Sequence, residues 1–226
     1  MTFWDLMGDV YWIYKRTRAP AFVSSLTGNG DAKKVMPELV KAGIHERKEV
    51  LLYLLVRSLR PKRVVETGVW YGWSSRAILS ALHANGEGRL FSIDLPTLGA
   101  GRIYEDGTVD PTRLDAVGDT GRAVPAYLRD KWDLRIVASP AESTAALAAS
   151  TKEGIDMFFH DSDHSYENML KEFQIAWAGL RPAGVLYADD VEWNLALRDF
   201  GRSVERTPHI FRLYPNARAA VGALVK

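Results

Sequence analysis

Three carboxylates follow two apolar runs of the sequence, and their positions could support metal chemistry. Asp161 comes directly after the apolar run 155–160. Asp189 and Asp190 come directly after the apolar run 184–188. Acids that are brought together at the ends of buried strands destabilise a protein unless a cation collects them. The chain contains no cysteine, so a metal would be held by oxygen or imidazole, which favours a hard ion such as Mg2+.

Each acid also has a purely structural explanation. Asp161 could cap the turn or helix that follows it, and Asp189 and Asp190 could be a solvated pair at a strand end. A shared metal site explains all three positions together, because the two strands are expected to be neighbours. We therefore predict that the three acids hold a divalent ion, which orients an acceptor hydroxyl and lowers its pKa.

The loop after Asp161 offers two groups that could accept a proton. Asp163 lies two residues further along this loop, and His164 titrates in the range that general-base catalysis needs. A loop histidine could instead orient a neighbour or bond to the backbone. We predict that Asp163 or His164 takes the proton from the acceptor, and the sequence leaves the choice open.

A glycine turn lies between a predicted strand at 63–66 and a predicted helix at 74–84. Gly68 and Gly72 allow the backbone to turn tightly and to approach a ligand closely. The free N–H groups at the helix start, near Ser74, favour a hydrogen-bond acceptor. Ordinary strand-to-helix turns also use glycine, and the spacing differs from that of dinucleotide-binding and phosphate-binding loops.

Two acids beside this turn narrow the choice of cofactor. Glu66 is the last residue of the predicted strand, where a carboxylate can meet an ammonium group. Asp94 ends the next predicted strand, where an acid can accept both hydroxyls of a ribose. A carboxylate at Glu66 would repel a pyrophosphate, which argues against NAD. The turn and its acids therefore suit a different nucleotide-like cofactor.

Strand and helix patterns alternate from about residue 45 onward, which predicts a mostly parallel sheet with helices on both faces. The predicted helices are 46–59, 74–84, 121–131, 142–150, 166–180 and 193–203, and the predicted strands are 63–66, 89–94, 133–138, 155–160 and 184–188. Two further strands at 209–214 and 219–225 predict an antiparallel C-terminal hairpin, which makes seven strands in total. Ligands collect at the carboxyl ends of the strands in such sheets. Every motif described above falls there.

Composition limits the classes of partner. With 226 residues, of which 47% are hydrophobic, the chain can bury a full core as one domain. A formal net charge of +1 gives no reason to expect nucleic acid or an anionic membrane as a partner. No apolar run is long enough for a membrane-spanning helix, and the N-terminus does not read as a secretory signal. We therefore expect a cytoplasmic protein that acts on a small molecule.

Four segments, taken in order, resemble the motifs of class I S-adenosylmethionine-dependent methyltransferases. These segments are 64–74, 91–94, 160–167 and 180–190. They are most similar to the branch that includes macrocin O-methyltransferase and related natural-product sugar O-methyltransferases. Ala183 departs from this pattern, because the family often has a glycine there. The resemblance implies a Rossmann-like fold in which residues 46–226 form the methyltransferase domain.

The same resemblance assigns cofactor contacts. Gly68 and Gly72 would border the methionine part of S-adenosylmethionine, Glu66 its amino group and Asp94 its ribose. The segment 139–142 would border the adenine. The other residues expected at the cofactor are Ser74, Ser139, Glu142 and Asp161. In metal-dependent members of the family, the ligands are at the positions of Asp161, Asp189 and Asp190.

The implied function is S-adenosylmethionine-dependent O-methylation of a small hydroxylated molecule with Mg2+. A natural-product sugar is favoured over a catechol-like phenol, because Asp190 stands where catechol-type enzymes carry an amide. Three alternatives stay open: a metal-independent methyltransferase, a catechol-type O-methyltransferase and a non-catalytic module that binds S-adenosylmethionine. Two segments, 1–45 and 95–120, carry no motif. Residues 1–45 are predicted to form a helical extension that caps the substrate or contacts a second subunit of a homodimer or higher homo-oligomer. Residues 95–120 are predicted to form a long active-site loop.

Overall fold

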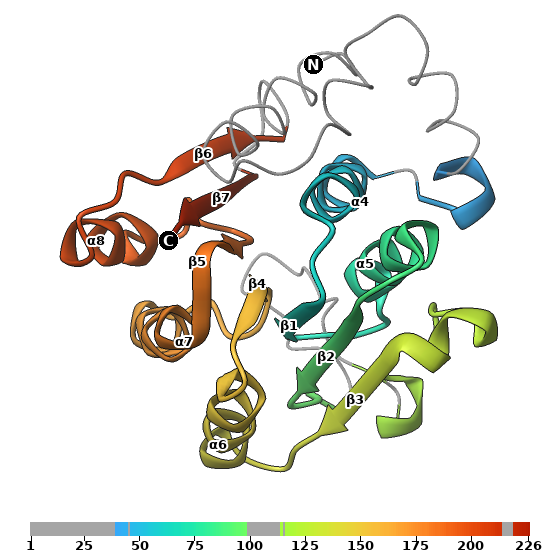
Figure 1. Cartoon of the computed structure of the whole chain (residues 1–226). Coiled ribbons are helices and arrows are strands. Elements are labelled where there is room, and N and C mark those ends of the chain that lie inside the picture. Colours follow the sequence, from blue (N-terminus) through green and yellow to red (C-terminus); the bar gives the residue numbers. More distant parts are fainter. Residues whose placement is uncertain (1–38, 45, 99–113, 115, 214–218) are drawn as a thin grey trace, which may run out of the picture.

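A seven-stranded sheet organises the part of the chain that the structure describes (Figure 1). The computed structural model describes residues 39–44, 46–98, 114, 116–213 and 219–226. The strand order is β3-β2-β1-β4-β5-β7-β6. The strands are β1 (Arg63–Thr67), β2 (Arg89–Asp94), β3 (Trp132–Ile136), β4 (Ile155–His160), β5 (Leu180–Ala188), β6 (His209–Arg212) and β7 (Ala220–Val225).

The first five strands pair in parallel, whereas β7 pairs antiparallel with both β5 and β6. Sequence order reverses between β1 and β4, so the carboxyl ends of these two strands meet at the topological switch point. This arrangement confirms the predicted α/β fold with a mostly parallel sheet and an antiparallel C-terminal pair. The turn predicted between the last two strands, at 215–217, lies outside the described residues.

Helices cover both faces of the sheet. The helices are α4 (Arg47–Leu59), α5 (Trp73–Asn85), α6 (Pro140–Thr151), α7 (Tyr166–Gly179) and α8 (Ala196–Ser203), with short 3-10 helices η1 (Val117–Asp119) and η2 (Ala126–Lys131). Figure 1 shows α4 and α5 on one face and α6, α7 and α8 on the other. No helix among the described residues is long and apolar enough to cross a membrane.

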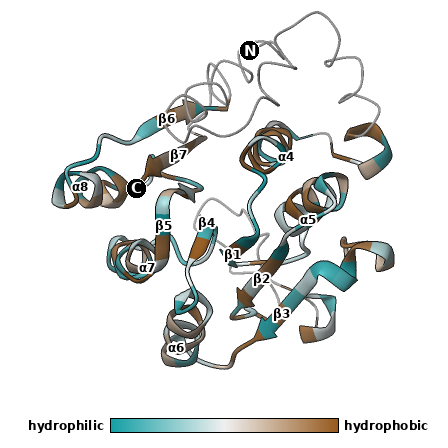
Figure 2. Cartoon of the chain, viewed as in Figure 1, coloured by the Kyte–Doolittle hydropathy of each residue, from teal (hydrophilic) through white to brown (hydrophobic). Residues whose placement is uncertain are grey.

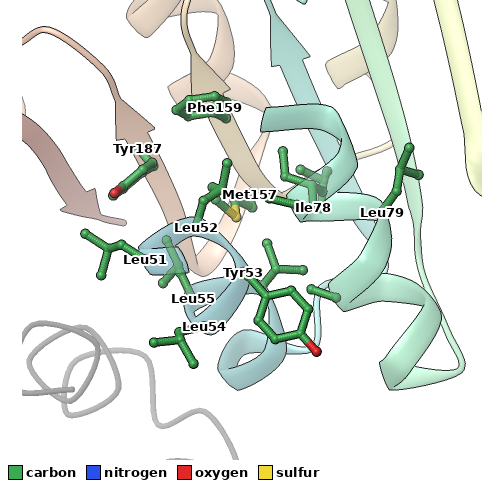
Figure 3. Close-up of a cluster of buried hydrophobic side chains, with 14 of the residues drawn as sticks. Leu51, Leu52, Tyr53, Leu54, Leu55, Ile78, Leu79, Met157, Phe159 and Tyr187 are labelled. Carbon is green, nitrogen blue, oxygen red and sulfur yellow. The ribbon is translucent and has the colours of Figure 1, made fainter. Parts of the chain in front are cut away.

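The central strands are apolar on both sides because each face is covered. Met157 and Phe159 of β4 enter the core on the side of α4 and α5, whereas Phe158 enters the core on the side of α6 and α7. This alternation is the two-residue period of a strand that is buried on both faces. Figure 2 accordingly shows brown, hydrophobic residues in the inner strands, and Figure 3 shows the core around α4.

Two predicted helices differ from the observed ones for local reasons. The prediction of helix over 121–131 is wrong in its first half, because Gly121 has φ +73° and Pro125 interrupts the segment before η2. The helix predicted from 193 begins at Ala196, after a turn in which the Asn194 side chain accepts from the Ala196 N–H at 2.8 Å. The loop that carries Trp193 is therefore longer than expected.

The two segments without motifs are described only at their ends. Within 1–45, residues 39–44 are described, and Leu39 and Ile44 are buried in the same core as α4. Within 95–120, Leu98 and Leu114 pair in an isolated parallel bridge. The rest of both segments, at 1–38, 45, 99–113 and 115, lies outside the described residues. Their predicted roles stay predictions.

Candidate active site

Backbone contacts join the glycine turn to the acidic loop. The Gly68 N–H donates to Ile93 O, the Asp161 N–H donates to Thr67 O, and both distances are 2.9 Å. Gly68 has φ +82°, and a Cβ atom at this position would lie 1.9 Å from the Asp161 carbonyl oxygen. A residue without a side chain is therefore needed where the two motifs meet. A ligand in the turn would lie next to the loop that begins at Asp161.

The second glycine of the turn begins helix α5. Gly72 has φ +86°, and a Cβ atom there would lie 2.9 Å from the Cα of Gly121. The Gly121 N–H donates in turn to Trp70 O at 2.8 Å. The first N–H groups of α5 have no partner within the helix, as at every helix start. Close approach of other backbone segments thus explains both glycines, and contact of the turn with a cofactor stays a prediction.

Asp94 has an open acceptor next to this turn. Its Oδ1 accepts from the Val69 N–H at 2.8 Å and from the Trp70 N–H at 3.5 Å. Its Oδ2 is buried and has no hydrogen-bond partner among the residues that the structure describes. Burial raises the pKa of Asp94, while the two backbone N–H groups oppose this shift. The nearby Thr120 hydroxyl, which has no hydrogen-bond partner of its own among the described residues, opposes it as well. A hydroxyl donor, such as a ribose, would satisfy the open oxygen.

Glu66 faces the protein interior. Three serine hydroxyls donate to its carboxylate: Ser74 at 2.7 Å, Ser75 at 2.6 Å and Ser92 at 2.6 Å. The side chain is fully buried, and burial raises its pKa despite these hydroxyls. Glu66 and Ser74 therefore order the turn and the start of α5. Their predicted direct contact with the cofactor stays a prediction.

Ser139 caps the start of α6, and Glu142 bonds to the backbone just before this cap. The Ser139 Oγ accepts from the Glu142 N–H at 3.2 Å, and the Glu142 Oε2 accepts from the Ala138 N–H at 3.0 Å. The pair follows β3, which lies beside the strand that ends in Asp94. This position lies at the same end of the sheet as Asp94, and contact with the adenine stays a prediction.

The acids after β4 and β5 come together around a lysine. The Lys48 ammonium of α4 donates to Asp189 Oδ2, and it lies 3.3 Å from Asp161 Oδ2. The Asp189 side chain is 5% exposed, whereas the Lys48 side chain is 32% exposed, so water reaches the pair from the lysine side. Burial raises the pKa of Asp161 well above its usual range, although Lys48 opposes the shift. Burial alone would lower the pKa of Lys48. The negative charges of Asp161 and Asp189 outweigh burial and raise this pKa, so the ammonium stays charged.

His164 lies beside these carboxylates. Its Nε2 is 3.8 Å from Asp161 Oδ1 and 3.9 Å from Asp190 Oδ2, and it has no hydrogen-bond partner within the described part of the chain. Burial, followed by the charge of His160, lowers the pKa of His164 to about 4. The imidazole is therefore neutral at neutral pH. A neutral imidazole can accept a proton or bind a metal.

The donor set for a metal differs from the predicted one. One ligand atom each from Asp161, His164 and Asp189 lies within 4.8 Å of the others, whereas Asp190 is outside this set. Asp190 has φ +48° at the end of β5, and burial together with Asp189 raises its pKa to about 6. Asp161 and Asp189 are thus brought together as predicted ligands. The roles of all these residues in metal binding stay predictions.

Asp163 points to the start of α7 instead. Its two carboxylate oxygens accept from the Ser165 N–H at 3.0 Å and the Ser165 Oγ at 2.9 Å. The residue is exposed. Of the two predicted proton acceptors, His164 therefore faces the carboxylates, and Asp163 contacts a helix start.

The sequence did not predict a buried polar network next to the loop that begins at Asp161. Glu172 of α7 lies 2.7 Å from His160 Nδ1, and its oxygens accept from Thr67 Oγ1 at 2.5 Å and Ser162 Oγ at 2.9 Å. Burial raises the pKa of Glu172, but the hydrogen bonds from these groups outweigh burial and lower it. The network ties α7 to the ends of β1 and β4. The sequence did contain a signal for this network, because Glu172 lies three residues after Met169 and therefore on the apolar face of the predicted helix.

Glu172→Gln is expected to destabilise the protein by about 2 kcal/mol, because a buried carboxylate loses its charge-assisted hydrogen bonds. The lowered pKa means that this stabilisation is present above pH 4.5, the ordinary pKa, and is lost as pH falls through the lower folded-state pKa. Urea unfolding at several pH values measures it. The exposed Glu167→Gln on the same helix is the control and should change stability by less than about 0.5 kcal/mol. Equal losses in both variants would contradict the network's role.

Lys48 also escaped the sequence analysis, although a signal was present. It stands four residues before Leu52 and seven before Leu55, and both leucines are fully buried. It therefore extends the buried face of α4 by one turn. Because Glu46 and Glu49 flank it, Lys48 could not be distinguished by sequence from the other charged residues at this helix start.

Comparison with known proteins supplies a family. A family model described as a methyltransferase domain matches residues 65–191, from β1 to just past β5. This match covers more than half of the chain. No curated protein sequence is significantly similar to the chain.

Solved structures share the fold at low sequence identity. An O-methyltransferase from Bacillus cereus, in complex with SAH, is 19% identical with a TM-score of 0.52, and the match covers 95% of this chain and 100% of that chain. The O-methyltransferase TomG from Streptomyces achromogenes, involved in tomaymycin synthesis, is 20% identical with a TM-score of 0.55 and 79% coverage of both chains. A putative caffeoyl-CoA O-methyltransferase from Staphylococcus aureus is 13% identical with a TM-score of 0.52, with 90% and 97% coverage. Taken with the family match, this Rossmann-like fold shows that the chain belongs to the methyltransferase domain family.

Proposed function

We propose that the protein transfers the methyl group of S-adenosylmethionine to a hydroxyl oxygen of a small molecule. The observation that carries this proposal is the contact at Gly68, where the glycine turn abuts the Asp161 loop. A cofactor in the turn and an acceptor at the carboxylates would then be neighbours. The open oxygen of Asp94 supports a cofactor that has a ribose.

The cluster suits an alcohol acceptor. An alcohol is a poor nucleophile near neutral pH unless it is deprotonated or coordinated. His164 has an open Nε2 that can take the hydroxyl proton as the oxygen attacks the methyl carbon. Burial lowers the pKa of this imidazole to about 4, which weakens it as a base, whereas the charge of Asp189 opposes that shift. The sulfonium becomes an uncharged thioether in the same step, and the proton remains on the imidazole.

A divalent ion such as Mg2+ fits the donor types at this site. Asp161 and Asp189 would hold it, with His164 or Asp190 as a further ligand. When bound, such an ion lowers the pKa of a hydroxyl and fixes its direction. If the ion takes His164 as a ligand, Asp163 is the remaining candidate for the proton.

A natural-product sugar is the favoured acceptor. Support comes from Asp190, which stands where catechol-type enzymes carry an amide, and from TomG, which acts in the synthesis of a natural product. A catechol-type phenol is the second candidate, and the S. aureus neighbour supports it. A cytoplasmic location, a homo-oligomeric state and the absence of nucleic-acid partners remain proposals from the sequence. The segments 1–45 and 95–120 are proposed to select the acceptor.

Methyl transfer from labelled S-adenosylmethionine to a panel of glycosylated natural products and catechols tests this function. The proposal expects label on an acceptor oxygen, with activity lost in EDTA and restored by Mg2+. Full activity in EDTA would exclude the metal. Binding of S-adenosylhomocysteine without any transfer across the panel would favour a non-catalytic module.

Asp94→Asn is expected to weaken binding of S-adenosylhomocysteine by about 10-fold or more, because hydrogen bonds to a charged group contribute about 1.5–3 kcal/mol each. Isothermal calorimetry measures the affinity. Asp133→Asn, at an exposed aspartate of β3, is the control and should bind as the unmodified protein does. Unchanged affinity in Asp94→Asn would contradict the assignment of Asp94 to the ribose.

A further inference from the structure

The positive charge between Asp161 and Asp189 is supplied by the side chain of Lys48. The Lys48 ammonium bonds to Oδ2 of both Asp161 and Asp189, and it is their one lysine or arginine partner among the described side chains. The two carboxylates come from different strands, and Lys48 comes from a helix that precedes both. Three distant segments of the chain are thus joined at one ammonium group.

The packing of α4 directs Lys48 to this position. Leu52 and Leu55 on the same face are fully buried, and Figure 3 shows Leu52 beside Met157 of β4. The next residue, Glu49, lies 3.6 Å from the Arg76 guanidinium, which also donates to Gly43 O. The first turn of α4 is therefore held from two sides, and the Lys48 side chain, 32% exposed, runs toward the acids.

A metal and the ammonium would use the same acids. Asp161 and Asp189 supply two of the three groups in the donor set, and Lys48 already bonds to one oxygen of each. Two cations on one carboxylate pair repel each other, and little water screens this repulsion at Asp189, which is 5% exposed. The third group, His164, is uncharged and does not offset a second cation. The pair therefore accommodates one cation at a time.

We propose that Lys48 is a tethered cation that competes with a divalent metal ion for Asp161 and Asp189, so that the metal binds when the ammonium leaves. This inference rests on the proposed metal site. In the metal-free protein, Lys48 is a positioning residue, because it holds the two acids together. With the metal bound, its long side chain extends toward solvent.

The affinity for metal alone tests this competition. Lys48→Met removes the charge but keeps the length, and it is expected to bind Mn2+ about 10-fold more tightly or better than the unmodified protein, because the charged hydrogen bonds from the ammonium no longer compete. Electron paramagnetic resonance counts free Mn2+ in each titration. Lys48→Arg keeps the charge and should not gain affinity. Lys62→Met, an exposed lysine before β1, controls for the change in net charge.

Three outcomes of this titration would overturn the inference: equal affinity in the unmodified protein and Lys48→Met, weaker affinity in Lys48→Met, or no binding to either. Affinity raised equally by Lys62→Met would also overturn it, because net charge alone would then explain the gain. Metal binding is read without turnover. Methyl transfer with unchanged metal affinity in Lys48→Met therefore refutes the competition and leaves the proposed function standing.

Amine labelling of the unmodified protein provides a test that does not depend on the folding of a variant. Lys48 is expected to react slowly with an acylating reagent in the metal-free protein and faster at saturating Mn2+, as mass spectrometry of the peptides would show. Lys62 should react equally in both states. Unchanged reactivity of Lys48 under conditions where Mn2+ is bound would contradict displacement of the ammonium.

Discussion

Replacing His164 with glutamine is expected to slow methyl transfer about 10²- to 10⁴-fold, the usual contribution of a general base. The reason is that Nε2 of His164 faces the carboxylates and has no hydrogen-bond partner among the described residues. Binding of S-adenosylhomocysteine should stay the same, because the glycine turn and Asp94 are untouched. Single-turnover rates at saturating cofactor measure the effect.

Asp163→Asn is the matched comparison. Asp163 contacts Ser165 at the start of α7, and asparagine keeps an acceptor there. We therefore expect near-normal transfer from this variant. The opposite result, a large loss in Asp163→Asn and little change in His164→Gln, would identify Asp163 as the proton acceptor and contradict the role proposed for His164.

Gly68→Ala is expected to destabilise the protein by roughly 3 kcal/mol or more. A Cβ atom there meets the Asp161 carbonyl oxygen at 1.9 Å, and φ +82° is unfavourable for any residue with a side chain. The backbone must shift, so cofactor binding should fall as well. Urea unfolding and calorimetry with S-adenosylhomocysteine measure the two effects.

Gly86→Ala measures the cost of backbone strain without the steric clash that a Cβ atom at Gly68 would cause. Gly86 has φ +76°, similar to Gly68, but no atom lies within 4 Å of its ideal Cβ position. Its loss should be about 1 kcal/mol, the cost of the left-handed conformation alone. If both variants lost the same stability, the close contact between the glycine turn and the acidic loop would not matter for folding.

The fold was readable from the sequence because strands and helices alternate with distinct periods. Phe158 and Phe159 of β4 are buried on opposite faces of the sheet. A strand that is buried on both faces is expected to have an uninterrupted apolar run. Gly121 and Pro125 were visible too, yet the apolar residues between them imitated a helix. The positive φ of Gly121 and the ring of Pro125 prevent an α-helix there, although the apolar pattern favours one.

The site was only partly readable. The end of a parallel strand is a position that sequence specifies well, so Asp161 and Asp189 could be expected near each other. Asp163 is oriented by a local contact with Ser165, whereas the direction of His164 depends on packing against Trp193, which the sequence did not show. Lys48 comes from outside the motifs, and its contact with the acids depends on how α4 packs.

Methyl transfer by Asp189→Ala tests the central claim most directly, because this residue lies in the acidic cluster and outside the predicted cofactor contacts. We predict that the variant binds S-adenosylhomocysteine as the unmodified protein does and transfers little or no label to the acceptor oxygen in a single turnover. Asp161→Ala should lose transfer in the same way. Transfer at the unmodified rate in Asp189→Ala would contradict the assignment of the catalytic site to this cluster.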